Sequence, residues 1–396
     1  MSSFTATALR PFGTTIFTTM TRLAQQHGAV NLSQGFPDFD GPEFLKDAAA
    51  KALRDQPNQY APMPGVPALR QAVADRFTRA TQVPVDPDTM VTVTAGCTEA
   101  IAATILGLCN PGDEVILFEP FYDSYRASVA MAGCTAKVVA LRPSARNGQD
   151  LGAFTFDEDE LWDAFSEDTR AILINTPHNP TGKVFSLAEL EIIANLCQKH
   201  DCLAICDEVY ERLLFDAAAH PHISLASLPG MAERTVTLNS LGKTISMTGW
   251  KIGWAIAPAA ITSGIRAAHQ FLTFAVNTPM QHAAAAGLAR EEEYVRDLVE
   301  RLRARRDELH AGLRNLGFAT HLPAAGYFII ADHTPFGFHD DAAFCKHLIE
   351  QIGVAAIPPS VFYERPDLGR SLVRFAFCKK PETIAEGLRR LQKLRR

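Results

Sequence analysis

Short apolar runs alternate with helical periods through the middle of the chain. Between about residues 91 and 258, six such runs predict buried strands, and the segments between them have the 3.6-residue period of amphipathic helices. The runs cover residues 91–95, 115–118, 171–174, 203–206, 235–238 and 254–257. One intervening helix begins with the capping-box spacing of Ser186 and Glu189. The alternation predicts an α/β domain whose mostly parallel sheet is covered by helices on both faces.

The pattern changes after residue 259 to long helices and then to a smaller α+β unit. A charge-rich helix is expected at about 291–316, with its Arg and Glu residues on a solvated face. The strands expected after it cover residues 327–331, 354–357 and 372–377, and the helices cover 341–351 and 382–394.

Three parts are therefore predicted along the chain. Residues 1–45 form an N-terminal arm and part of the small domain, 46–290 form the large domain, and 291–396 form the small C-terminal α+β domain. Within the large domain, residues 142–159 are rich in Asn, Gly and acidic side chains and predict its longest irregular connection.

Composition narrows the class of protein. The 396 residues are 47% hydrophobic and 21% charged, with a formal charge of −6, which is ordinary for a globular protein and argues against a nucleic-acid binder. We find no apolar run of membrane-spanning length and no secretory signal pattern, so we expect a cytoplasmic protein. The eight cysteines form no CxxC pair, and we expect them to be reduced and the protein to have no metal site.

Lys243 is the first candidate for chemistry. It follows the apolar run 235–238 and lies in the Ser- and Gly-containing turn 240–244. A lysine that leaves a buried strand can be held desolvated, which favours the neutral, nucleophilic amine required for Schiff-base chemistry with pyridoxal phosphate. A single loop lysine is more often a solvated charge, so its companions decide between the two interpretations.

Three polar motifs follow other predicted strands, where parallel sheets bind ligands. Gly96, Cys97 and Thr98 open a helix that could bind a phosphate, or they form a glycine turn with a threonine N-cap. Asn179 lies between two prolines that could aim its amide at a phenolate oxygen, or the segment is only a rigid turn. Asp207 could pair with a protonated pyridine nitrogen, or it caps a helix.

Arg374 interrupts the apolar strand predicted at 372–377. An arginine in the middle of a buried strand needs a bidentate partner. That partner is either a substrate α-carboxylate or an internal carboxylate in an ion pair.

Four motifs carry a resemblance that extends from Pro11 onward: residues 31–39, 58–63, 175–180 and 206–210. With the residues above, and in this order, they resemble the class I aminotransferases of pyridoxal-phosphate fold type I. The resemblance is nearest to the branch of methionine aminotransferase and kynurenine aminotransferase, the latter also known as glutamine transaminase K or cysteine-conjugate β-lyase. It implies pyridoxal 5'-phosphate as the cofactor and a homodimer with shared active sites.

The resemblance also implies roles for individual residues. Lys243 is expected to bind the cofactor covalently and to act as the base, with Asp207 at the pyridine nitrogen. Asn179 and Tyr210 are expected at the phenolate oxygen, and Tyr122 on the ring face. The other expected cofactor contacts, most of them at the phosphate, are Gly96, Cys97, Thr98, Ser240, Lys251 and, from the neighbouring subunit, Tyr60.

The substrate site follows from the same resemblance. Gly35, Asn179 and Arg374 are expected to bind the α-carboxylate, while Phe274 and Phe328 line the side-chain pocket. Because residues 269–276 contain no arginine, methionine-like, aromatic and glutamine-type donors are expected, with a 2-oxo acid as acceptor. A β-lyase on the same scaffold is the alternative, and a regulator that only senses the cofactor is disfavoured.

Overall fold

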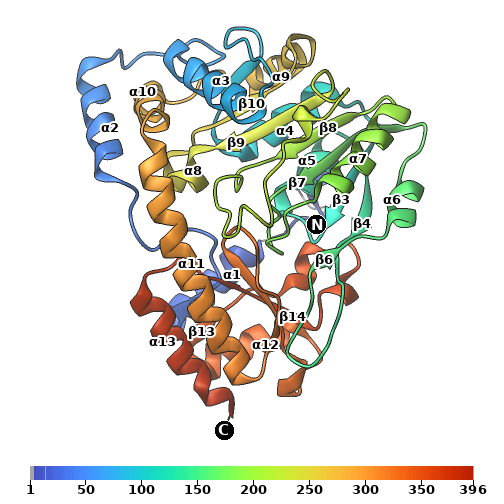
Figure 1. Ribbon diagram of the computed structural model, residues 1–396, viewed down its shortest axis with the longest axis vertical. Helices are drawn as coiled ribbons and strands as arrows, with labels where there is room; N and C mark the ends of the chain where they lie inside the picture. The colour runs from blue at the N-terminus through green and yellow to red at the C-terminus, as the bar shows by residue number, and fades with distance from the viewer. Residues whose placement is uncertain (1–3, 14, 396) are drawn as a thin grey trace.

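The computed structural model describes residues 4–13 and 15–395, so residues 1–3, 14 and 396 of the predicted N-terminal and C-terminal parts lie outside the described residues. A seven-stranded sheet occupies the upper part of the molecule in Figure 1, in the spatial order β2-β10-β9-β8-β7-β3-β4. Its strands are β2 (Val91–Thr94), β3 (Glu114–Glu119), β4 (Thr135–Ala140), β7 (Thr169–Asn175), β8 (Leu203–Asp207), β9 (Thr235–Ser240) and β10 (Gly253–Ile256).

The predicted mostly parallel sheet is confirmed. β10 runs antiparallel to β2 and β9, and the other neighbouring strands are parallel. One strand, β4, was not predicted. It lies at the edge of the sheet, and only its last two residues are buried, so the apolar run that marked the central strands is missing there.

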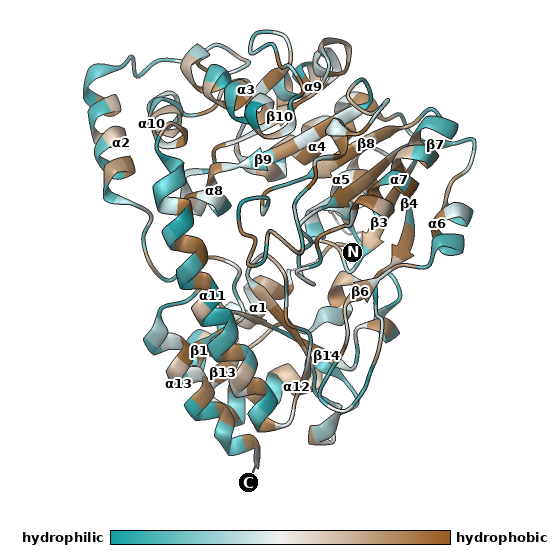
Figure 2. Ribbon diagram, in the orientation of Figure 1, coloured by the Kyte–Doolittle hydropathy of each residue, from teal (hydrophilic) through white to brown (hydrophobic). Residues whose placement is uncertain are grey.

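Helices cover both faces of this sheet, as predicted. Val115 and Leu117 of β3 pack in a core with α4 (Gly96–Leu108), α5 (Asp123–Met131) and α9 (Ala259–Leu272). The alternate residues Ile116 and Phe118 point to the opposite face, where they pack with α6 (Glu158–Ala164) and α7 (Leu187–Lys199). The hydrophobic colouring of these strands is visible in Figure 2. The capping box of Ser186 and Glu189 at the start of α7 is also confirmed.

A smaller antiparallel sheet lies below, in the order β11-β12-β14 (Figure 1). Its strands are β11 (Ala319–Thr320), β12 (Phe328–Asp332) and β14 (Leu372–Ala376). The helices packed with it are α1 (Ile16–Gln26), α11 (Glu291–Leu316), α12 (Asp341–His347), which continues into a π-helical turn Leu348–Ile352, and α13 (Pro381–Leu391).

The two ends of the chain share one core in this lower part. β1 (Val30–Asn31) pairs in parallel with β13 (Val354–Ala355), and Met20 and Leu32 are buried with residues of α11 and β14. The strand expected at 354–357 is thus shorter than predicted. This packing supports the prediction that part of the N-terminal segment belongs to the small domain. The domain boundaries near residues 45 and 290 stay a prediction. The remaining helices are α2 (Glu43–Asp55), α3 (Pro67–Thr81), α8 (Leu241–Thr244) and α10 (Thr278–Leu288).

Helix α11 begins and ends where the sequence predicted, but its charges are not all solvated. Glu291 is buried and accepts a hydrogen bond from Arg76 Nε at 2.7 Å. Arg306 is also buried, and its Nη1 donates to the Pro323 carbonyl at 3.0 Å. Both charges are tolerated because each has a polar partner. In the described part of the chain, neither this helix nor any other is long and apolar enough to cross a membrane.

The segment 142–159 is largely irregular, as predicted, but it is not without structure. It contains the antiparallel pair β5 (Arg142–Pro143) and β6 (Phe154–Thr155), and its tip reaches the smaller sheet. Thr320 N donates to the Gln149 carbonyl at 3.1 Å, and Arg146 forms a salt bridge with Asp332 at 3.0 Å. These partners lie more than 150 residues away, so local pattern gave no sign of them.

Candidate active site

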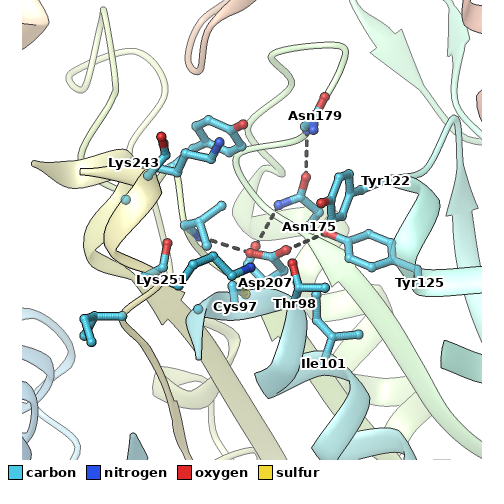
Figure 3. A pocket seen from close by; sticks show the side chains of 17 residues that line it. Cys97, Thr98, Ile101, Tyr122, Tyr125, Asn175, Asn179, Asp207, Lys243 and Lys251 are labelled. Atoms are coloured by element: carbon cyan, nitrogen blue, oxygen red, sulfur yellow. Dashed lines mark hydrogen bonds between the residues drawn. The ribbon is translucent and has the colours of Figure 1, made fainter. Parts of the chain in front are cut away.

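A cavity of about 240 Å³ opens at one edge of the large sheet (Figure 3). β2, β7, β8 and β9 run in the same direction, so their carboxyl ends meet at this edge. The predicted residues that line the cavity are Gly96, Cys97, Thr98, Tyr122, Asn179, Asp207, Tyr210, Ser240, Lys243 and Lys251.

Lys243 lies on the short helix α8, directly after β9. Its Nζ donates to the Gly35 carbonyl at 3.2 Å and lies 5.7 Å from the ring centres of Tyr210 and Tyr327. Burial lowers the pKa of Lys243 below that of an ordinary lysine. A buried amine whose neutral form is favoured fits the nucleophile and base that Schiff-base chemistry requires.

Asp207 is the last residue of β8 and is buried. Its Oδ2 accepts a hydrogen bond from the Tyr125 hydroxyl at 2.6 Å, and its Oδ1 accepts from Val209 N at 3.2 Å (Figure 3). Burial raises the pKa of Asp207, and the hydrogen bond from Tyr125 is the largest opposing effect. A turn follows Asp207, so its alternative role as a helix cap is wrong. The known donors to this buried carboxylate are uncharged, so it can also accept a hydrogen bond from a protonated nitrogen of a ligand in the cavity.

The amino end of α4 forms a cradle suited to an anion. The N-cap is Ala95, which offers no capping side chain, so the alternative of a threonine cap is wrong. Gly96 has φ +75°, and a Cβ there would lie 3.4 Å from Lys251 Nζ. The free N–H groups of the first turn, the helix dipole and the ammonium group of Lys251 together fit a phosphate.

Asn179 is held by a chain of hydrogen bonds that ends at Asp207. Asn179 N donates to Asn175 Oδ1 at 2.7 Å, and Asn175 Nδ2 donates to the Asp207 carbonyl at 2.9 Å (Figure 3). The Thr176-Pro177 and Asn179-Pro180 peptide bonds are cis. The side chain of Asn179 lines the cavity.

Arg374 is buried in β14, and its hydrogen bonds go to uncharged oxygens. Nη2 donates to the Ser33 carbonyl at 3.0 Å and Nη1 to Asn179 Oδ1 at 3.4 Å, while Nε has no partner among the described residues. The alternative of an internal ion pair is therefore wrong within the described chain. Burial lowers the pKa of Arg374 to about 10.

Three aromatic rings surround the guanidinium group of Arg374. We call these three rings the aromatic cage. The distances from the guanidinium carbon to the ring centres are 4.2 Å for Phe328, 5.1 Å for Phe362 and 5.3 Å for Phe17. Gly35 packs against Phe328 so closely that a Cβ would lie 2.5 Å from the ring, so a larger residue would require the ring to shift. A buried guanidinium group that has a free N–H donor and is surrounded by aromatic rings suits a ligand with one carboxylate and an apolar side chain.

Five predicted site residues do not line the cavity: Gly35, Arg374 and Phe328, which meet at the aromatic cage, and Tyr60 and Phe274. Tyr60 is 84% exposed, and Phe274 is 39% exposed. Their rings contact edge to face, with centres 5.3 Å apart. Neither of these two residues lines the cavity of its own chain.

Among the site residues that were not predicted, Tyr125, Asn175, Phe17 and Phe362 make the contacts described above. Tyr125 lies one helical turn after Tyr122, and that spacing could have signalled a shared face. Asn175 lies in the motif 175–180, but no role was predicted for it. Phe17 and Phe362 gave no signal, because apolar residues in short helical segments ordinarily belong to the core.

Comparison with known proteins identifies the family. The family described as "Aminotransferase class I and II" matches residues 27–391. The methionine aminotransferase of Escherichia coli is 44% identical over 387 residues, covering 98% of this chain and 97% of that protein. The structure of N-succinyldiaminopimelate aminotransferase from Mycobacterium tuberculosis superposes with a TM-score of 0.94 at 48% identity, covering 98% of this chain and all of that one.

A kynurenine–oxoglutarate transaminase from Mus musculus is 39% identical over 391 residues, covering 93% of this chain and 85% of that protein. Enzymes of this family and fold depend on pyridoxal phosphate, and the cradle, the buried Lys243 and the buried Asp207 fit that cofactor. The chain belongs to the class I and II aminotransferases and is a pyridoxal-phosphate-dependent transferase of fold type I.

Proposed function

We propose that the enzyme transfers the amino group of an L-amino acid with an apolar, sulfur-containing, aromatic or amide side chain to a 2-oxo acid. The aromatic cage around Arg374 is the observation that carries this proposal. It offers one guanidinium group to one carboxylate and flat, polarizable rings to the rest of the donor. The two cations that line the cavity, Lys243 and Lys251, are assigned to the cofactor in this proposal.

In this proposal each residue has one task. Pyridoxal phosphate, when bound, supplies an electron sink for the charge left at the substrate α-carbon. Arg374 and Asn179 hold the α-carboxylate, which directs the α-hydrogen toward Lys243. The neutral Nζ of Lys243 would accept that proton and then donate it again, so that the lysine ends the transfer neutral. Asp207 holds a proton at the ring nitrogen, and the rings of the cage exclude water.

N-succinyldiaminopimelate transamination is a second candidate, because the relative of that name has the higher identity of the two bacterial relatives, 48% against 44%. Such a donor brings further carboxylates that need cationic partners at the rim of the site. Arg126 of α5 is the nearest basic residue after Tyr122 along that helix, but it already forms a salt bridge with Glu364 at 2.8 Å. We therefore place this donor second to the methionine-like donors.

A panel of donors tests the proposal. We expect kcat/KM for aspartate to be at least about 100-fold below that for methionine, phenylalanine or glutamine, because an unpaired second carboxylate in an aromatic pocket costs several kcal/mol. Aspartate as the best donor would contradict the proposal. N-succinyl-diaminopimelate as the best donor would establish the second candidate, and pyruvate and ammonia as main products from β-chloroalanine would favour the β-lyase alternative.

Arg374→Lys tests the carboxylate contact. A point ammonium cannot reproduce the bidentate fork, so we expect transition-state binding to weaken by roughly 2 to 3 kcal/mol, a fall of about 30- to 150-fold in kcat/KM for every donor. Steady-state kinetics with methionine and phenylalanine measure it. Unchanged values for both donors would remove Arg374 from the substrate site.

We also propose a homodimer whose active sites are shared. Tyr60, Phe271 and Phe274 are exposed aromatic residues, and Phe271 is 90% exposed, which is unusual for a surface that stays in water. We expect Tyr60 to contact the cofactor phosphate of the partner subunit and Phe274 to contact its substrate.

Subunit mixing tests that arrangement. Tyr60→Ala and Lys243→Ala dimers are each expected to be impaired, and an equal mixture should regain up to about one quarter of wild-type activity. Half of the mixed dimers are hybrids, and each hybrid has one intact site of two. Absence of complementation, with subunit exchange verified by native mass spectrometry, would mean that Tyr60 does not act across the interface.

A further inference from the structure

Tyr125 has no role in the proposed function, although it contacts the centre of the site. It is 3% exposed and lies on α5, one turn after Tyr122. Its hydroxyl donates to Asp207 Oδ2 at 2.6 Å, the length of a charge-assisted hydrogen bond to a carboxylate (Figure 3). Burial raises the pKa of Tyr125 well above its ordinary range, so the hydroxyl keeps its proton and remains a donor.

The carboxylate is held from two sides. Tyr125 binds one oxygen, and the backbone N–H of Val209 binds the other at 3.2 Å. The main chain of Asp207 is fixed separately, because its carbonyl accepts hydrogen bonds from Asn175 Nδ2 and from Thr176 N. The bond from Tyr125 therefore acts on the orientation and charge of the side chain, whereas the backbone position does not depend on it.

The charge of Asp207 is under opposing influences. Burial favours the neutral acid, whereas the donated hydrogen bond of Tyr125 favours the anion, and the ammonium form of Lys243 and the thiol of Cys97 are the other titratable groups that favour the anion. If the carboxylate became the stronger base, a proton between it and a pyridine nitrogen would move to the carboxylate. The ring would then lose the positive charge that makes it an electron sink.

We propose that Tyr125 is a positioning residue that keeps Asp207 ionised and directed at the pyridine nitrogen, an inference that rests on the proposed role of Asp207. The ring of Tyr125 has a further contact, edge to face with Tyr122 at 5.8 Å between ring centres. Tyr125→Phe keeps that contact and removes only the hydroxyl. The variant therefore isolates the hydrogen bond.

The test uses holoenzyme loaded with pyridoxal phosphate that carries nitrogen-15 in the ring. In Tyr125→Phe we expect the ring-nitrogen chemical shift to move toward the unprotonated value, and the single-turnover rate of α-proton removal to fall roughly 10- to 100-fold with KM changed less than about threefold. Tyr363→Phe is the matched control, because Tyr363 is also buried but does not line the cavity. A role limited to filling the core would leave the nitrogen shift unchanged, and that result would overturn the inference.

A second variant, Tyr125→His, keeps the inference falsifiable if Tyr125→Phe is poorly folded, and a double-mutant cycle tests whether Tyr125 acts through Asp207. Tyr125→His retains a donor and should recover part of the lost rate and of the nitrogen shift. In an Asp207→Asn background, Tyr125→Phe should cause no further fall, whereas an additive fall would contradict action through Asp207. If Asp207→Asn is itself silent, the proposed role of Asp207 fails; if it is severe and Tyr125→Phe is silent, only the present inference fails.

Discussion

Replacing Lys243 with alanine is expected to lower kcat for transamination by about 10⁴-fold, because the change removes both the covalent anchor and the general base. Few interactions are lost with the side chain, which makes one hydrogen bond to the described residues, from Nζ to the Gly35 carbonyl. The fold should therefore persist. We also expect the variant to retain pyridoxal phosphate noncovalently, since the cradle at Gly96 and Lys251 is unchanged.

Steady-state rates, circular dichroism and thermal unfolding of purified Lys243→Ala measure these outcomes. Lys51→Ala is the control, because its side chain is 75% exposed and pairs only with Asp55 on the surface of α2. Near-normal turnover by Lys243→Ala would refute the assignment of the catalytic lysine. A variant that fails to fold would instead be recognised by its unfolding profile.

Asp207→Asn is expected to lower the single-turnover rate of α-proton removal by about 10³-fold, the size of effect found when a preorganised electrostatic contact is removed. The amide has the shape of the carboxylate and can still accept the hydrogen bond from Tyr125. It lacks the negative charge that stabilises a protonated ring nitrogen. Exchange of the α-hydrogen of methionine for deuterium measures this step directly, and an unaltered exchange rate would exclude the role.

The central strands, and the polar residues that follow them, could be predicted because both leave local signals in the sequence. A strand buried on both faces, such as β7 or β8, is a continuous apolar run, and a polar residue at its end has few roles other than ligand contact. Asp207 and Lys243 were found in this way. The edge strand β4 has no such run and was missed.

Contacts between distant segments could not be predicted. The aromatic cage joins Phe17 of α1 to Arg374 of β14, although 357 residues separate them, and each phenylalanine taken alone is an ordinary core residue. The tip of segment 142–159 likewise finds its hydrogen-bond partners in the smaller sheet. The sequence specified which residue types were available, whereas the fold decides which of them meet.

Lys243 is the residue that we expect to bind pyridoxal phosphate covalently. Reduction of the holoenzyme with sodium borohydride makes the lysine–cofactor bond permanent, and peptide mass spectrometry then locates it. We expect the phosphopyridoxyl mass on the peptide that contains Lys243, and we expect it to disappear when methionine is added before the reduction, because the donor displaces the lysine. The cofactor mass on any other lysine, or on none, would contradict the account.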